Sequence, residues 1–166
     1  APLPGTRFEV ELTRRLLGAG PGAARFGADF TAAAVQSAPL SQYRILHFAT
    51  HALLPGELSC VPEPALVVSP AAGARDAASA FLPASELLRL RLDADLVMLS
   101  ACNTAGPATG VAGVAGNAGE ALSGLARSFF FAGARGLLVT HWPAGDRAAA
   151  AVVIQTSSGS AMPGAP

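Results

Sequence analysis

Four short runs of consecutive apolar residues stand out in the middle of the chain, and each is bounded by proline, aspartate or glycine. They cover residues 44–49, 65–68, 96–99 and 136–140. Runs of this length that are rich in Leu, Ile and Val predict β-strands. Because apolar residues follow one another without alternating with polar ones, we expect strands that are covered on both faces, as in a parallel sheet.

Helical patterns flank and separate these strands. Helices are predicted over residues 9–17, ended by Gly18; over 31–36, capped by Thr31; over 84–90, with Ser85 as a possible cap; and over 120–132, closed by Gly133. Residues 18–29 read as a loop with room for a short strand. Asp95 is expected to be a solvated strand start, and Phe129, Phe130 and Phe131 are expected to contribute to the core.

The order of these elements predicts the fold class. Strands alternate with helices, which is typical of an α/β fold with an open, mostly parallel sheet and helices on both faces. In such sheets reactive groups collect at the carboxyl ends of the strands. The residues that follow the strands are therefore the first candidates for a functional site.

Composition supports a folded chain and excludes several classes of protein. Of the 166 residues, 51% are hydrophobic and 13% are charged, whereas an ordinary domain has roughly 25% charged residues. That length suits one domain with a sizeable core. The eleven basic residues, all Arg, balance eleven acidic ones and form no basic stripe, so we expect no nucleic-acid partner.

Membrane insertion is not expected either. Two long stretches carry no charge, residues 96–119 and 148–166, but polar residues and glycines interrupt both. Neither stretch supplies the roughly 20 contiguous apolar residues that a spanning helix needs. The two cysteines, Cys60 and Cys102, make no disulfide framework, and this pattern favours a cytoplasmic protein.

A histidine and a cysteine follow two of the predicted strands. His51 comes after the strand that ends near Phe48, and Cys102 comes after the strand that ends near Leu99. If these strands are parallel neighbours, both side chains emerge at one edge of the sheet. A nearby imidazolium raises the reactive thiolate fraction of a cysteine, and the imidazole can protonate a leaving amine. The backbone N–H groups of Ala52 and Cys102 lie in suitable loops for an oxyanion hole.

Structural interpretations compete with this chemistry. A single cysteine at the end of an apolar strand is often a small buried hydrophobe, and a single histidine is often a hydrogen-bonded core residue. Glycines at 106, 110, 113, 116 and 119 invite a phosphate-loop interpretation, but the chain has no lysine for that motif. A zinc site built from His47, His51, Cys60, Cys102 and His141 lacks any close ligand pair on one helical face. Cys60 itself reads as an incidental loop thiol.

Four ordered motifs resemble a known family. They are YRILHFATH at 43–51, LVMLSACNT at 96–104, GEALSGLARSF at 119–129 with AGAR at 132–135, and HWP at 141–143. Together with LPGT at 3–6 they are similar to the CHAT-domain family of caspase-like proteins, over roughly residues 3–147.

This resemblance implies a caspase-like three-layer α/β fold and a cysteine endopeptidase related to separases and caspases. His51 matches the catalytic histidine of the family and Cys102 its nucleophile, while His47 matches a first histidine that is expected to be structural. A protein or peptide substrate is implied, and no metal or organic cofactor is expected. Members are commonly bacterial and often follow tetratricopeptide repeats, so such a region is expected in the full-length protein.

The chain departs from the family pattern at three places. Ala52 replaces the glycine that usually follows the catalytic histidine, and Ala144-Gly145-Asp146 follows Trp142-Pro143 where the family has a Val-Asp-Asp-like stretch. From Gln155 to Pro166 a polar segment stands where the family continues through further helices. We therefore expect one domain over residues 1–150, cut at both ends, followed by a disordered or frayed tail over 151–166.

Two other functions remain compatible with the sequence. The first is a catalytically silent CHAT module that acts in signalling or binds partners through the same groove. The second is a fragment that is active only with its missing flanks. The sequence specifies neither the physiological substrate nor the preferred residue at the cleavage point.

Overall fold

The computed structural model describes residues 5–55, 57–58, 61–100 and 117–139, with side chains in the last range from residue 124 onward. The chain divides into two units, which are described separately: residues 5–26 belong to one unit and residues 27–139 to the other. Both sheets and the candidate site lie in the second unit.

The first unit contains helix α1, Thr6–Leu16, close to the predicted range. Gly18 ends it in the left-handed conformation, with φ 67°, as expected for a glycine after a helix. Arg14 reinforces this end, because its guanidinium hydrogen-bonds both the Glu11 carboxylate and, at 2.7 Å, the carbonyl oxygen of Ala19. Two 3₁₀ turns follow along the chain, Pro21–Ala23 and, at the start of the second unit, Gly27–Asp29, so the short strand expected within 18–29 is wrong.

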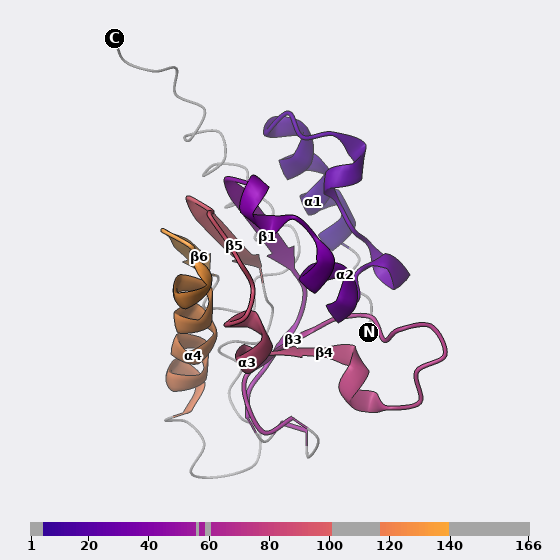
Figure 1. Ribbon diagram of the computed structural model, residues 1–166, viewed down its shortest axis with the longest axis vertical. Helices are drawn as coiled ribbons and strands as arrows, with labels where there is room; N and C mark the ends of the chain where they lie inside the picture. The colour runs from indigo at the N-terminus through magenta and orange to yellow at the C-terminus, as the bar shows by residue number, and fades with distance from the viewer. Residues whose placement is uncertain (1–4, 56, 59–60, 101–116, 140–166) are drawn as a thin grey trace. The chain divides into compact units, whose positions relative to one another are not determined.

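Three of the predicted strands form a parallel sheet. Strands β1 (Ile45–Ala49), β5 (Leu96–Ser100) and β6 (Leu137–Val139) lie in the order β1-β5-β6, and both pairings are parallel. Helix α4 (Asn117–Ala132) comes between β5 and β6 in the chain and lies alongside this sheet (Figure 1). A parallel pair needs such a crossover connection, and the helix supplies it. The predicted α/β class with a mostly parallel sheet is confirmed.

Side chains of the parallel strands point alternately to the two faces of the sheet, and one of these faces belongs to the core. The rings of Phe48 in β1 and Phe129 in α4 lie 5.3 Å apart between centroids, tilted by 43°, which is a favourable aromatic arrangement. Leu46, Val97 and Leu99 belong to the same buried core. The core also takes in residues of helices α2, α3 and α4, of the segment after α3 and of the second sheet, including Val35, Leu66, Leu82, Leu87, Leu90 and Leu125.

A second, antiparallel sheet is formed by strands β2 (Ala52–Leu53), β3 (Ala65–Val67) and β4 (Phe81–Pro83). The predicted strand at 65–68 is thus real, but its expected place in the parallel sheet is wrong. An apolar run reports burial and carries no information on strand direction. Ala65 and Leu66 are fully buried, which is why this strand reads like a parallel one.

Helices α2 (Ala32–Ser37) and α3 (Ala84–Leu87) begin in different ways. The Thr31 side chain caps α2 by accepting a hydrogen bond of 3.1 Å from the N–H of Ala34, as predicted. Ser85 does not cap α3. Its N–H and hydroxyl both donate to the carboxylate of Glu63, at 2.8 and 2.7 Å, so the carboxylate that serves this helix start comes from 22 residues earlier. Two further 3₁₀ turns occupy Leu40–Gln42 and Ala77–Ala80.

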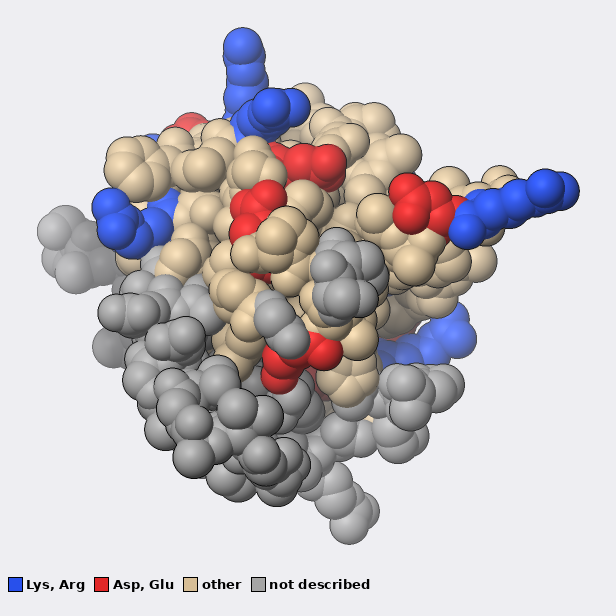
Figure 2. All heavy atoms as spheres, turned by 90° about the horizontal axis from the view of Figure 1, so that it is seen from below, with Lys and Arg blue, Asp and Glu red and all other residues tan. Residues whose placement is uncertain are grey.

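An ion cluster joins the amino ends of the three parallel strands. Asp95, just before β5, pairs with Arg44 before β1 and, at 3.0 Å, with Arg135 before β6. Asp93 accepts a second hydrogen bond from Arg135, and this bond raises the pKa of the guanidinium. The expectation that Asp95 is merely solvated is wrong, although exposed pairs of this kind add little stability. On the face shown in Figure 2 the arginines project separately and form no continuous basic surface.

The three consecutive phenylalanines of α4 do not share one environment. Phe129 is fully buried, whereas Phe130 is 48% and Phe131 73% exposed. The prediction of a core role therefore holds for Phe129 alone, because a helix turns by about 100° per residue and cannot bury three successive side chains against one sheet. Among the described residues, no helix has both the length and the apolarity needed to cross a bilayer.

Gly133 ends α4 at a place where no side chain fits. Its φ is 112°, and a Cβ atom built there would lie 2.3 Å from the carbonyl oxygen of Leu92. The close approach has a function in the fold, since the N–H of Leu92 donates to the carbonyl of Ala132 at 2.8 Å and draws the helix end against the segment that leads into β5.

Replacing Gly133 by alanine is therefore expected to lower the free energy of unfolding by about 2 kcal/mol or more, through both strain and overlap. Gly73→Ala is the matched control, because Gly73 also has positive φ, 78°, but a Cβ there meets nothing within 4 Å. It should cost only about 1 kcal/mol. Urea unfolding followed by circular dichroism measures both, and equal losses would contradict the packing argument.

Candidate active site

The site is built where β1 leaves the parallel sheet. β1 ends at Ala49, Thr50 and His51 follow, and β2 begins at Ala52. The N–H of Thr50 donates to the carbonyl oxygen of Ser100 at 3.2 Å, which extends the β1–β5 pairing one residue beyond β1. The predicted catalytic histidine thus follows directly from a residue that is held to the end of β5.

Two hydrogen bonds to a single residue of β3 hold this turn. The hydroxyl of Thr50 donates to the carbonyl oxygen of Val67 at 2.6 Å, and the N–H of Val67 donates to the carbonyl oxygen of His51 at 2.8 Å. Thr50 is buried and His51 is half-buried. The backbone that carries His51 is consequently fixed by both sheets, by β5 through Thr50 and by β3 through Val67.

β5 ends at the same edge of the parallel sheet. Ala49 and Ser100 are register partners, and Cys102 follows Ser100 at the offset of two residues by which His51 follows Ala49. Cys102 lies outside the described residues. Cys60, His141, Trp142 and the glycine-rich stretch from 106 to 116 also lie outside them. The pairing of the two strands that lead to His51 and Cys102 is nevertheless fully described.

The N–H of Ala52, the predicted oxyanion donor, is not used in its own sheet. Ala52 is the register partner of Leu66, and the bond from Val67 to His51 makes residues 51 and 67 the hydrogen-bonded pair. Hydrogen-bonded and non-hydrogen-bonded pairs alternate along an antiparallel ladder. The pair Ala52–Leu66 is therefore not hydrogen-bonded, and the N–H of Ala52 points away from β3. A strand residue has extended backbone, which alanine adopts as readily as glycine.

A contact that the sequence did not predict joins His47 to Ser100. The imidazole nitrogen His47 Nε2 and the hydroxyl oxygen Ser100 Oγ lie 3.1 Å apart. Both residues are on the face opposite Phe48 and Leu99, since His47 pairs with Met98 and side chains alternate along each strand. His47 thus lies within β1, four residues before His51, and contacts the last residue of β5. The signal was available in principle, because His47 lies within one apolar run, Ser100 follows the next, and their pairs are two positions apart in a parallel register.

Metal binding finds no further support within the described ranges. They contain no group of three or more His, Cys, Asp or Glu residues placed to hold a metal ion. Three of the five residues of the zinc alternative, Cys60, Cys102 and His141, lie outside those ranges.

Comparison with known proteins identifies the family of the chain. The family model of the CHAT domain matches residues 1–158, nearly the whole chain. The chain belongs to the CHAT domain family, which is a family of caspase-like, cysteine-peptidase-type domains. No curated protein and no solved structure matches the chain.

The Thr50 hydroxyl should be needed for the stability of this turn. Thr50→Val keeps the shape but leaves the carbonyl of Val67 without its donor, and we expect a loss of about 1–2 kcal/mol in the free energy of unfolding. Thr50→Ser keeps the hydroxyl and should cost less than half as much. Thermal and urea unfolding of the two variants test this, and a Val variant as stable as the Ser variant would show that the bond to Val67 contributes nothing.

Proposed function

We propose that the chain is a cysteine endopeptidase that hydrolyses peptide bonds of a protein substrate through His51 and Cys102. One observation carries the proposal: β1 and β5 are adjacent parallel strands in register at Ala49 and Ser100, and the two residues follow these strands at the same offset. Membership of a caspase-like peptidase family supports the same assignment.

In the proposed reaction the sulfur of Cys102 attacks the carbonyl carbon of the scissile bond as thiolate. The imidazolium of His51 gives its proton to the leaving amine as the C–N bond breaks, and a thioester with the first half of the substrate remains. Water then attacks the thioester while His51 takes one of its protons. The C–S bond breaks, which releases the acid product and restores the Cys102 thiolate and the His51 imidazolium. No metal or organic cofactor enters these steps.

The negative oxygen of each tetrahedral intermediate needs hydrogen-bond donors. We assign this role to the backbone N–H groups of Ala52 and Cys102. The orientation of the Ala52 N–H, away from the β2–β3 ladder, supports this assignment, because a donor already used in the ladder would not be free for an oxyanion. The hydrogen bonds that hold Thr50 and His51 to Val67 also support this assignment, because oxyanion donors act by being held in place before the reaction.

A site-selective alkylation experiment tests whether Cys102 is activated. At pH 6 an ordinary thiol is less than about 1% thiolate. Iodoacetamide should therefore label Cys102 at least about tenfold faster than Cys60, which serves as the internal control, and His51→Gln should bring the two rates together. Peptide mapping by mass spectrometry gives both rates. Equal and slow labelling in the unmodified chain would support the catalytically silent module instead.

Cleavage itself is tested with a pool of fluorogenic peptides that varies the residue before the scissile bond. Cys102→Ala should reduce hydrolysis to background, and His51→Gln should lower kcat about 100-fold or more. Cys60→Ala is the matched control and should leave hydrolysis unchanged. Hydrolysis that survives Cys102→Ala in a chain with unchanged circular dichroism would refute the assignment. If the unmodified chain is inactive, adding the flanking sequence of the full-length protein distinguishes an incomplete enzyme from a silent one.

A further inference from the structure

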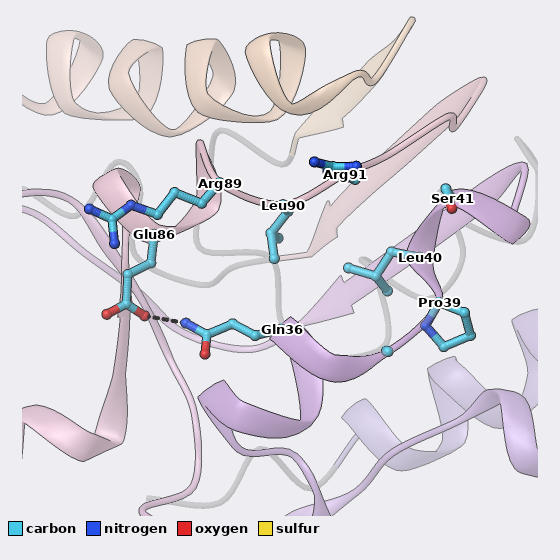
Figure 3. Close-up of a pocket in the computed structure, with 9 residues that line it drawn as sticks. Gln36, Pro39, Leu40, Ser41, Glu86, Arg89, Leu90 and Arg91 are labelled. Carbon is cyan, nitrogen blue, oxygen red and sulfur yellow. Dashed lines mark hydrogen bonds between the residues drawn. The ribbon is translucent and has the colours of Figure 1, made fainter.

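A hollow of about 580 Å³ lies between helix α2, the turn that follows it and the segment after helix α3. Its base is apolar: Leu90 is buried, and Leu40 is partly buried beside it. In Figure 3 the two leucine side chains extend into the space between the segments. The volume is within the range of roughly 300–1,000 Å³ that ligand pockets have, and the hollow lies entirely within the second unit.

Two arginines lie at the rim. Arg89 and Arg91 flank Leu90, and both are exposed. Within the described part of the chain their guanidinium groups form no ion pair and no side-chain hydrogen bond, whereas Arg14, Arg44 and Arg135 are all paired with carboxylates. Arginine is well suited to bind carboxylates, because its planar fork of donors matches their geometry.

The acidic residue of the hollow is already engaged. Glu86 accepts a hydrogen bond of 2.7 Å from the amide nitrogen of Gln36, drawn as a dashed line in Figure 3. This bond joins α3 to α2 across one side of the hollow and leaves one carboxylate against two guanidinium groups. The lining therefore keeps a net positive charge next to an apolar base.

We propose that this hollow binds an acidic peptide segment of a partner protein in which an apolar residue is flanked by acidic residues. The apolar side chain would cover Leu40 and Leu90, and the flanking carboxylates would pair with Arg89 and Arg91. This docking site is independent of the proposed peptidase activity.

The test measures the fluorescence anisotropy of a labelled peptide, Glu-Asp-Leu-Asp-Glu, titrated with the full 166-residue chain. The chain carries Cys102→Ala so that hydrolysis cannot consume the probe. Saturable binding is expected, weakened at least about tenfold by Arg89→Gln with Arg91→Gln and by raising the salt concentration to about 1 M. Arg75→Gln, which removes an exposed charge outside the hollow, is the matched control and should leave the affinity unchanged.

Two altered peptides separate the contributions. Gln-Asn-Leu-Asn-Gln lacks the carboxylates and Glu-Asp-Ser-Asp-Glu lacks the apolar side chain, and each should bind at least about tenfold more weakly. Equal binding of the neutral peptide, or unchanged affinity of the double arginine variant, would overturn the proposal. So would displacement of the probe by an oligodeoxythymidylate of higher affinity, which would indicate a nucleic-acid site. The proposal would also be overturned if the peptide does not bind while sedimentation shows that the double variant has lost a self-association of the parent chain. That result would assign the hollow to a contact with a second copy.

Discussion

The parallel pairing of β1 with β5 is the constraint on which the rest of the second unit depends. Five residues of each strand are in register, from Ile45 with Leu96 to Ala49 with Ser100. At the amino end the carbonyl oxygen of Arg44 accepts from the N–H groups of Asp95 and Leu96, and at the carboxyl end the N–H of Thr50 continues the ladder. A slip by one residue would turn His47 toward Phe129 and Phe48 away from it, so burial enforces this register.

The same register separates packing from polar contacts around the site. Phe48 and Leu99 face the core under α4, while His47 and Ser100 contact each other on the opposite face. Carboxyl-end residues can therefore carry polar groups without opening the core. Since β5 lies between β1 and β6, it has backbone partners on both sides, which makes it the most firmly held of the three strands. The proposed nucleophile, Cys102, thus follows in the chain from the central strand of the described parallel sheet.

The sequence predicted correctly those helices and strands that are determined by residues close together in the chain. Apolar runs bounded by helix and turn residues identify β1, β5 and β6, and Thr31 and Gly133 mark helix ends through their own side chain or lack of one. What was missed depends on residues far away in the sequence. β2 has two residues and β4 ends in proline, so neither has a strand pattern, and the carboxylate at the start of α3 belongs to Glu63. The direction of β3 also has no local signal.

The candidate site shows the same division with a functional consequence. Two apolar strands ending before His51 and Cys102 predicted one shared edge, and the pairing of β1 with β5 agrees with it. The backbone of His51, however, is held by Val67 of the antiparallel sheet, which the pattern did not predict. Among the described residues, the strand that leads to Cys102 belongs to the parallel sheet, whereas the turn that carries His51 is held by both sheets. An interaction that shifts β3 would therefore act on the backbone of His51 before it affects β5.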